Sequence, residues 1–144
     1  MEIVSLSSAS YPKLVSIWEA SVRATHGFVD EAYLSVIKEM LAPQFFPSLA
    51  LYGAVTQGSV VGFIGLAGKM IEMLFIDPHY RGQGIGRKLV AHAVAHFEAE
   101  EVDVNEQNEQ ALGFYEHLGF VIVGRSELDG LGKPYPLLHL RLVK

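Results

Sequence analysis

The sequence contains no cysteine, few basic residues and no long hydrophobic run, and each deficit excludes a class of protein. Without cysteine there is no disulfide scaffold, thiolate zinc site, iron–sulfur cluster or thiol nucleophile. Only 11 Lys and Arg stand against 16 Asp and Glu, which argues against a general nucleic-acid binder. No run approaches the roughly 20 apolar residues that a bilayer crossing needs, and the N-terminus lacks a signal-peptide pattern. We therefore expect a cytoplasmic protein with neither nucleic acid nor membrane as a partner.

Length and apolar content favour a single folded unit. The chain has 144 residues, of which 50% are hydrophobic and 19% are charged. A chain of this size buries roughly two thirds of its unfolded surface, so it needs neither disulfides nor metal to fold. We expect one domain over residues 1–144. No metal is expected, because His92 and His96, four residues apart on one predicted helix, lack an obvious third ligand.

The spacing of apolar residues predicts alternating helices and strands. Leu14, Trp18 and Val22 recur at helical spacing. Asp30 is a suitable N-cap for a second helix, and Pro43 lies just beyond the predicted end of that helix. The predicted helices span residues 11–25, from the Asp30 cap to 41, from a glycine loop to about 99, and 108–118, and the predicted strands span 3–5, 50–56, 60–67, 70–76, 102–105, 121–127 and 137–142. The order β-αα-βββ-α-β-α-ββ mixes hairpins with crossovers, which predicts an α+β fold: a mixed, mostly antiparallel sheet flanked by helices.

A loop with three glycines, Arg-Gly-Gln-Gly-Ile-Gly at residues 81–86, is the most informative stretch. It follows a predicted strand and opens a helix. Glycine lets the backbone approach a ligand closely, and the first N–H groups of a helix have no internal partner and carry the positive end of the helix dipole. Such a turn binds phosphate, and Arg81, Arg87 and Lys88 add positive charge around it.

Two nucleotide-binding signatures do not fit this loop. A P-loop requires Lys-Ser or Lys-Thr after the glycines, and neither is present. A Rossmann fingerprint requires a third glycine where this chain has Arg87 or Leu89, depending on the starting glycine. A strand–helix turn without a ligand stays open as the simpler interpretation.

Two motifs resemble the GNAT superfamily of N-acetyltransferases. Arg81, Gly84 and Gly86 match its Q/R-x-x-G-x-G/A signature, and residues 108–120 are similar to its N-x-x-A-x-x-F-Y-x-x-x-G-F segment. Residues 74–81 and the order of elements also resemble the family, over nearly the whole chain, and segments at 24–26, 105–111 and 131–138 resemble a subgroup of bacterial members. The resemblance implies a single GNAT acyl-CoA N-acyltransferase fold with acetyl-CoA as the acetyl donor.

The resemblance also implies a set of site residues. In this family the signature loop holds the pyrophosphate of acetyl-CoA, and the pantetheine arm lies between the splayed fourth and fifth strands. Tyr115 matches the tyrosine that acts as general acid toward the departing CoA thiolate. The residues implied in cofactor binding are Leu74, Phe75, Ile76, Arg81, Gly82, Gln83, Gly84, Ile85, Gly86, Arg87 and Asn108.

The acceptor amine must be neutral before it attacks the thioester. An amine like that of lysine has a pKa of about 10.4, so holding it neutral at pH 7 costs about 4.6 kcal/mol. Glu72 on the fourth strand, Asp103 on the fifth, or a water chain are the candidate bases, and the sequence does not choose among them. Since cysteine is absent, an acetyl-cysteine intermediate is excluded, which favours direct transfer from CoA to the amine.

The resemblance points to a primary amine as acceptor and, within the bacterial subgroup, to a protein lysine side chain. A small-molecule amine and a non-catalytic acyl-CoA-binding sensor remain alternatives. His26 and residues 133–136 are candidate acceptor contacts, with packing turns as the alternative. The net charge of −5 favours a cationic acceptor, and the sequence leaves a homodimer open.

Overall fold

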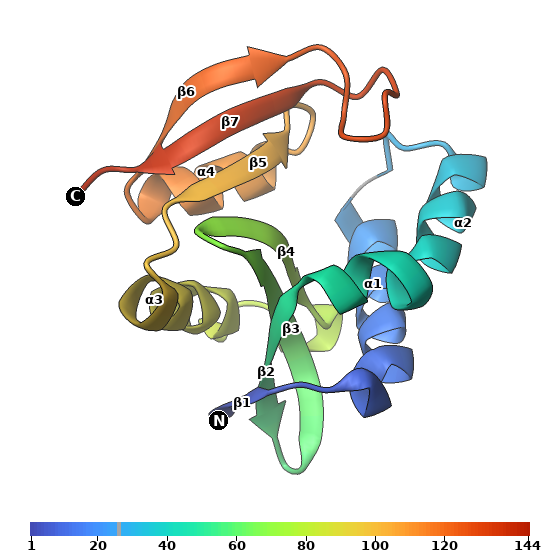
Figure 1. Ribbon diagram of the computed structural model, residues 1–144, viewed down its shortest axis with the longest axis vertical. Helices are drawn as coiled ribbons and strands as arrows, with labels where there is room; N and C mark the ends of the chain where they lie inside the picture. Colours follow the sequence, from blue (N-terminus) through green and yellow to red (C-terminus); the bar gives the residue numbers. More distant parts are fainter. Residues whose placement is uncertain (26) are drawn as a thin grey trace.

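A seven-stranded sheet with helices on both faces forms the protein, in a computed structural model that describes residues 1–25 and 27–144 (Figure 1). Every predicted helix and strand is present, with bounds that differ by at most two residues. The strands are β1 (Glu2–Ser5), β2 (Ala50–Thr56), β3 (Ser59–Ala67), β4 (Met70–Ile76), β5 (Glu101–Asn105), β6 (Phe120–Ser126) and β7 (Leu137–Leu142). The α-helices are α1 (Tyr11–Thr25), α2 (Glu31–Met40), α3 (Ile85–Phe97) and α4 (Glu109–His117).

The sheet has the strand order β1-β2-β3-β4-β5-β7-β6, and its central pair separates. All neighbouring strands are antiparallel except β4 and β5, which are parallel and pair only at Met70 with Glu101 and at Ile71 with Val102. A β-bulge follows at once, because Met73 pairs with Gly65 and Ile71 with Leu66, which leaves Glu72 as an extra residue. A bulge bends and twists its strand, so β4 diverges from β5 beyond this point.

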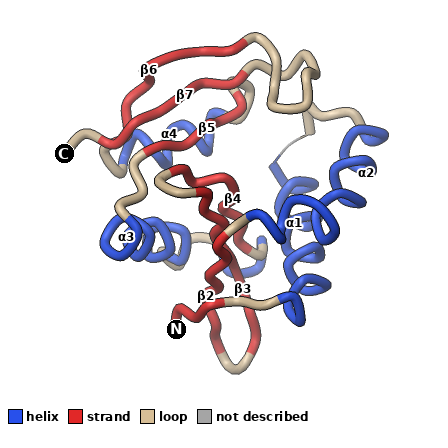
Figure 2. The backbone as a smooth tube through the Cα atoms, viewed as in Figure 1, coloured by secondary structure: helices blue, strands red, loops and turns tan. Residues whose placement is uncertain are grey.

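Two hydrophobic cores lie on opposite faces of the sheet. Helices α1 and α2 cover one face of β2–β4. On the other face of the sheet, α3 covers β2–β4 and α4 covers β5 and β6, as the tube view shows (Figure 2). Successive side chains of β4 point to opposite faces of the sheet and so enter both cores. Phe75 packs in the core under α1 and α2, and Leu74 and Ile76 pack in the core under α3 and α4. The most deeply buried large side chains are Phe46, Phe63, Phe120, Leu14, Leu41, Ile64, Leu89, Leu140 and Val61.

The second helix agrees with the prediction at its start and differs at its end. Asp30 is the N-cap, and its side chain accepts a hydrogen bond from the backbone N–H of Ala32. The sequence placed Pro43 just beyond the helix, but Pro43 lies inside a π-helical turn, η2 (Leu41–Phe45), that extends it. The wider i→i+5 turn closes through the N–H of Phe46 and the carbonyl of Leu41. Pro43 lacks an N–H, so a local turn of this kind accommodates it.

Candidate active site

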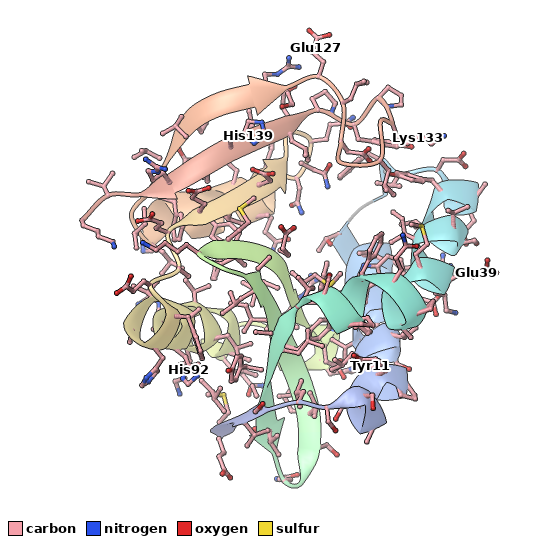
Figure 3. All side chains as sticks on the ribbon, in the orientation of Figure 1. Tyr11, Glu39, His92, Glu127, Lys133 and His139 are labelled. Atoms are coloured by element: carbon pink, nitrogen blue, oxygen red, sulfur yellow. The ribbon has the colours of Figure 1, made fainter. Side chains whose placement is uncertain are left out.

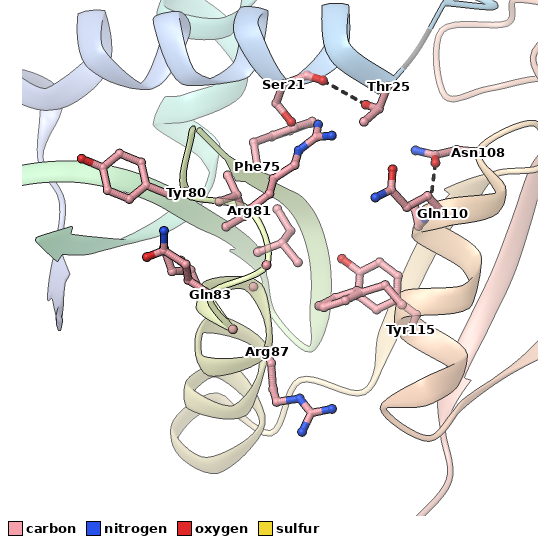
Figure 4. Close-up of a pocket in the computed structure, with 18 residues that line it drawn as sticks. Ser21, Thr25, Phe75, Tyr80, Arg81, Gln83, Arg87, Asn108, Gln110 and Tyr115 are labelled. Carbon is pink, nitrogen blue, oxygen red and sulfur yellow. Dashed lines mark hydrogen bonds between the residues drawn. The ribbon is translucent and has the colours of Figure 1, made fainter. Parts of the chain in front are cut away.

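A cavity of about 710 Å³ lies between α4 and the part of β4 that has separated from β5 (Figure 4). Its lining includes Ser21 from α1, Phe75 from β4 and Tyr115 from α4. Because α1 and α4 lie on opposite faces of the sheet, the cavity extends through the sheet rather than along one face. A ligand can therefore enter from one layer and meet a second reactant that comes from the other.

The glycine loop forms one wall of this cavity at the start of α3. Gly84 is the N-cap of α3 and has a φ of 76°, in the left-handed region that favours glycine. Gly86 is needed for a different reason: a Cβ there would lie 3.3 Å from the ring of Phe114, which also lines the cavity. Unpaired N–H groups of the first helical turn thus face open space, as an anion site requires.

Positive charge surrounds this loop without a counter-charge. Arg81 and Arg87 line the cavity, and Lys88 follows on α3. Among the described residues, no ion pair includes any of these three side chains. The loop can therefore bind an anion with several negative charges, such as a pyrophosphate.

An open strand edge forms the second wall. Leu74, Phe75 and Ile76 line the cavity at the part of β4 that has no partner on β5. Backbone groups on such an edge are not used by the sheet and are available to a ligand that adds itself as an extended segment. The edge is therefore suited to a molecule with amide groups spaced along a chain.

Tyr115 forms the third wall and, among the described residues of the lining, is the only titratable one that is buried. Its side chain is 6% exposed, and its ring packs edge-on against Phe114 and Phe120. The phenol oxygen is turned toward the gap in Figure 4. Burial raises the pKa of Tyr115 above its ordinary value, because the charged phenolate loses solvation. The hydroxyl is therefore held as a proton donor at neutral pH.

Asn108 lines the cavity and also caps the helix that follows it. It is the N-cap of α4, where its side-chain oxygen accepts the backbone N–H of Ala111 at 3.1 Å. This cap fixes the first turn of the helix that carries Tyr115.

The cavity brings together all twelve residues that the sequence predicted, and six more. Five of the additional residues were already present in motif segments, but their motifs gave them no separate role. Ser21 carries a weaker signal, as a polar residue on the buried face of an amphipathic helix. The six are Ser21, Thr25, Tyr80, Gln110, Ala111 and Phe114.

The candidate bases Glu72 and Asp103, and residues 133–136, lie outside this lining. Glu72 is the bulge residue where β4 and β5 part, and Asp103 is on the neighbouring strand β5. Burial, and secondarily the negative charge of Asp103, raise the pKa of Glu72 above its ordinary value. His26 lies outside the described residues.

Residues 133–136 belong to the β6–β7 loop, which is fastened to α2 instead of opening into the cavity. The ring of Tyr135 stacks on that of Tyr33 at 5.4 Å, and its hydroxyl accepts the backbone N–H of Asp30 at 3.0 Å. The hydroxyl of Tyr33 donates to the carboxylate of Asp129. Lys133 is visible in this loop in Figure 3. Of the two alternatives for this segment, an acceptor contact and a packing turn, the structure shows a packing turn at Tyr135.

An anion-binding glycine loop, an open strand edge and a buried phenol around one gap in a mixed sheet define the site of an acyltransferase that uses a CoA thioester. The family model of the acetyltransferase (GNAT) domain matches residues 19–131, and the chain belongs to this family. The predicted fold is confirmed, as is acetyl-CoA as the donor, which GNAT acetyltransferases use.

Similar proteins agree with this assignment. The chain is 51% identical, over 89% of its length and 88% of the relative's, to the peptidyl-lysine N-acetyltransferase YjaB of Salmonella typhimurium. The solution structure of apo YjaB from Escherichia coli superposes with a TM-score of 0.89 at 46% identity, covering 99% of this chain and 97% of that one. The fold also matches an N-acetyltransferase of Thermoplasma acidophilum solved with coenzyme A, with a TM-score of 0.78 at 23% identity, covering 99% and 98% of the two chains.

No helix in the described part of the chain has both the length and the apolar character needed to span a bilayer. This finding concerns the helices alone.

Proposed function

We propose that this protein transfers the acetyl group of acetyl-CoA directly to the side-chain amine of a lysine in another protein. The observation that carries the proposal is the cavity that passes through the sheet, with the anion-binding loop and Tyr115 on its walls. The name of the Salmonella relative, a peptidyl-lysine N-acetyltransferase, supports lysine as the acceptor.

In this proposal the cofactor lies along the two walls formed by the backbone. The pyrophosphate binds the N–H groups from Gly82 to Gly86, with Arg81 and Arg87 as the positive neighbours. The pantetheine arm pairs with the open edge of β4 at residues 74–76. Asn108 and Tyr115 then lie at the end where the thioester would be held.

Proton movement in the proposed reaction balances without a cofactor other than CoA. The ammonium of lysine loses one proton to become a neutral amine, which attacks the thioester carbonyl. The nitrogen then loses a second proton to solvent as the C–N bond forms and the C–S bond breaks. Tyr115 gives its proton to the CoA thiolate and regains one from solvent. Burial raises the pKa of Tyr115, so its hydroxyl stays protonated at neutral pH until the thiolate forms beside it.

Glu72 is the base that we propose for the amine. It lies where the two strands separate, and its raised pKa makes its carboxylate a stronger base than an ordinary glutamate. The charge of a lysine ammonium also favours a position next to the two carboxylates of Glu72 and Asp103.

A screen of acceptors, scored by release of CoA, tests the proposed function. Lysine peptides, proteins and small amines are incubated with acetyl-CoA, and binding of CoA is measured in parallel by calorimetry. We expect CoA release with lysine-containing polypeptides and mass spectrometry to find the added acetyl group on the lysine side chain. Turnover with small amines alone would show that the acceptor is a small-molecule amine and not a protein lysine. Tight binding without release on any acceptor would instead support a non-catalytic acyl-CoA sensor.

The same proposal includes four properties that other measurements address. We infer that residues 1–144 fold as one domain and that the protein is cytoplasmic. We also infer that nucleic acid and membrane are not its partners, and a homodimer stays open as the oligomeric state. A single cooperative unfolding transition checks the single domain, and cell fractionation checks the cytoplasmic location. Light scattering during size-exclusion chromatography checks for the homodimer. The edge strand β6 exposes Val121, Ile122 and Val123, and this apolar run supports testing for a dimer.

A further inference from the structure

Three side chains on neighbouring strands form a continuous hydrogen-bonded row. Nδ1 of His139 on β7 lies 2.6 Å from Oδ1 of Asp103 on β5, and Nε2 of the same ring lies 2.6 Å from Oγ of Ser126 on β6. Figure 3 shows His139 on the sheet, on β7. A second cavity, of about 320 Å³, is lined by Asp103 and His139. The row therefore lies beside open space.

The two short contacts fix which atoms carry protons. A bare Nδ1 would point its lone pair at a carboxylate, so the contact with Asp103 requires Nδ1–H to donate. In the neutral ring, Nε2 then accepts the hydroxyl proton of Ser126. This is the Asp–His–Ser arrangement in which the carboxylate and the hydroxyl hold an imidazole in one tautomer.

The row ends next to the proposed base. Asp103 follows Val102, which pairs with Ile71, and Glu72 follows Ile71 on the adjacent parallel strand. Val102 and Ile71 both point to the core of α3 and α4, so Asp103 is turned to the opposite face, the side of α1 and α2. Polar side chains thus cross four strands in the sequence Glu72, Asp103, His139 and Ser126.

We propose that His139 is a positioning residue of the acetyl transfer, which with Ser126 fixes Asp103 as an anionic neighbour of Glu72, the group that takes the proton of the acceptor ammonium. This inference rests on the proposed function. The ammonium gives one proton to the Glu72 carboxylate, and Glu72 returns it to solvent after the C–N bond has formed. His139 and Asp103 exchange no proton with the substrate.

The state of His139 sets the charge beside Glu72. With a neutral ring, Asp103 keeps its full negative charge, which attracts the ammonium and keeps the proton affinity of Glu72 high. With a protonated ring, the imidazolium compensates Asp103 and weakens both effects. The other charged groups around His139 are Glu101 on β5 and Arg141 on β7, which form an ion pair with each other at 3.1 Å.

Two substitutions of His139 separate positioning from bulk. His139→Asn keeps a donor where Nδ1–H points at Asp103, but it cannot titrate. His139→Ala removes the donor. With a lysine peptide we expect kcat/KM of the Ala variant to fall at least about tenfold at pH 7. The Asn variant should keep most of the high-pH rate and lose less than wild type does as the pH falls below 7.

The matched control is His96→Asn on α3, whose ring lies against His92 and Phe97. We expect this variant to keep the wild-type rate and pH profile. A second acceptor, a hydrazide peptide that is neutral at pH 7, needs no deprotonation before it attacks the thioester. The Ala variant should lose little activity with it, whereas general damage to the site would lower both rates equally and overturn the proposal.

The possible failures can be told apart. Absence of CoA release by wild-type protein with every amine would overturn the proposed function, and the inference with it. Wild-type turnover combined with an unchanged pH profile in both His139 variants would overturn the positioning role alone. If the variants do not fold, ¹⁵N NMR of wild-type His139 decides: we expect protonated Nδ1 and a ring titration that coincides with the acidic limb of kcat/KM, and a ring that titrates elsewhere contradicts the proposal.

Discussion

Tyr115 illustrates how one residue serves the fold and the proposed chemistry together. Its ring packs against Phe114 and Phe120 and belongs to the core of α3 and α4, while its oxygen is turned to the cavity. The same burial that holds the ring raises the pKa of the hydroxyl. Removing the oxygen should therefore change the chemistry with little effect on packing.

Tyr115→Phe is expected to keep the affinity for CoA and to lower kcat for acetyl transfer at least about tenfold, because the thiolate loses its proton donor. Calorimetry with CoA and steady-state kinetics measure the two quantities. Tyr11→Phe, at a ring that contacts Phe46 in the other core, is the control and should leave both unchanged. An unaltered kcat in the Tyr115 variant would remove Tyr115 from the mechanism.

The close contact between Gly86 and Phe114 predicts that a larger residue at position 86 weakens CoA binding. Gly86→Val would press a side chain onto the ring of Phe114, which is 3.3 Å from the position of the first added atom. Since Phe114 lines the cavity, we expect the dissociation constant for CoA to rise at least about tenfold, or about 1.4 kcal/mol. Gly113→Val on α4 has nothing within 4 Å and should bind CoA as wild type does. Equal affinities would mean that the loop is only a turn.

At the scale of elements, contacts between the β6–β7 loop and α2 hold the C-terminal part of the chain against its N-terminal part. Asp129 is its centre, because its carboxylate accepts the hydroxyl of Tyr33 and the backbone N–H groups of Leu131 and Lys133. These contacts order the loop and hold it against the first helices. These contacts limit the movement of the β6–β7 loop and of α2 relative to each other.

Asp129→Ala is expected to lower the free energy of unfolding by about 1–3 kcal/mol, because one hydroxyl and two backbone donors lose a charged acceptor. Urea denaturation measures the change. Glu127→Ala, an 87% exposed side chain two residues earlier, is the control and should change it little. A loss no larger than that of the control would show that the loop is held by the stacked rings of Tyr33 and Tyr135 instead.

At the scale of the whole molecule, acid stability follows from four exposed carboxyl groups. The pKa values of Glu19, Glu31, Asp77 and Glu106 are lowered by hydrogen bonds, respectively, from the Lys38 side chain, the Arg23 side chain, the His79 backbone and the Arg125 side chain. A lowered carboxyl pKa stabilises the folded state above the unfolded pKa, and this stabilisation is lost as pH falls through the folded value.

We therefore expect Tm to fall as the pH is lowered below about 4, the ordinary range of carboxyl pKa values, and to change little from pH 6 to pH 8. Glu72 acts in the opposite sense, since its raised pKa favours the folded state when it is protonated. Calorimetry from pH 2 to pH 8 measures the profile. High salt should reduce the acid sensitivity, because these groups are exposed and screened; a profile that salt does not alter would contradict this origin.

The sequence by itself determined the elements and the binding loop. Helical spacing, strand-length apolar runs and glycines act between near neighbours, so the bounds agree within two residues and all twelve predicted site residues line one cavity. The local pattern was insufficient at Pro43, where a π-helical turn continues a helix that the proline was expected to follow.

Only the tertiary structure decided what happens between distant segments. The bulge that isolates Glu72, the brief pairing of β4 with β5 and the row from Asp103 through His139 to Ser126 depend on strand register. Register is set by packing across the sheet, and one residue of shift would turn each side chain to the other face. The glycine loop is thus a contiguous sequence motif, whereas the proposed base and its polar neighbours come from four strands and could be found only in the folded chain.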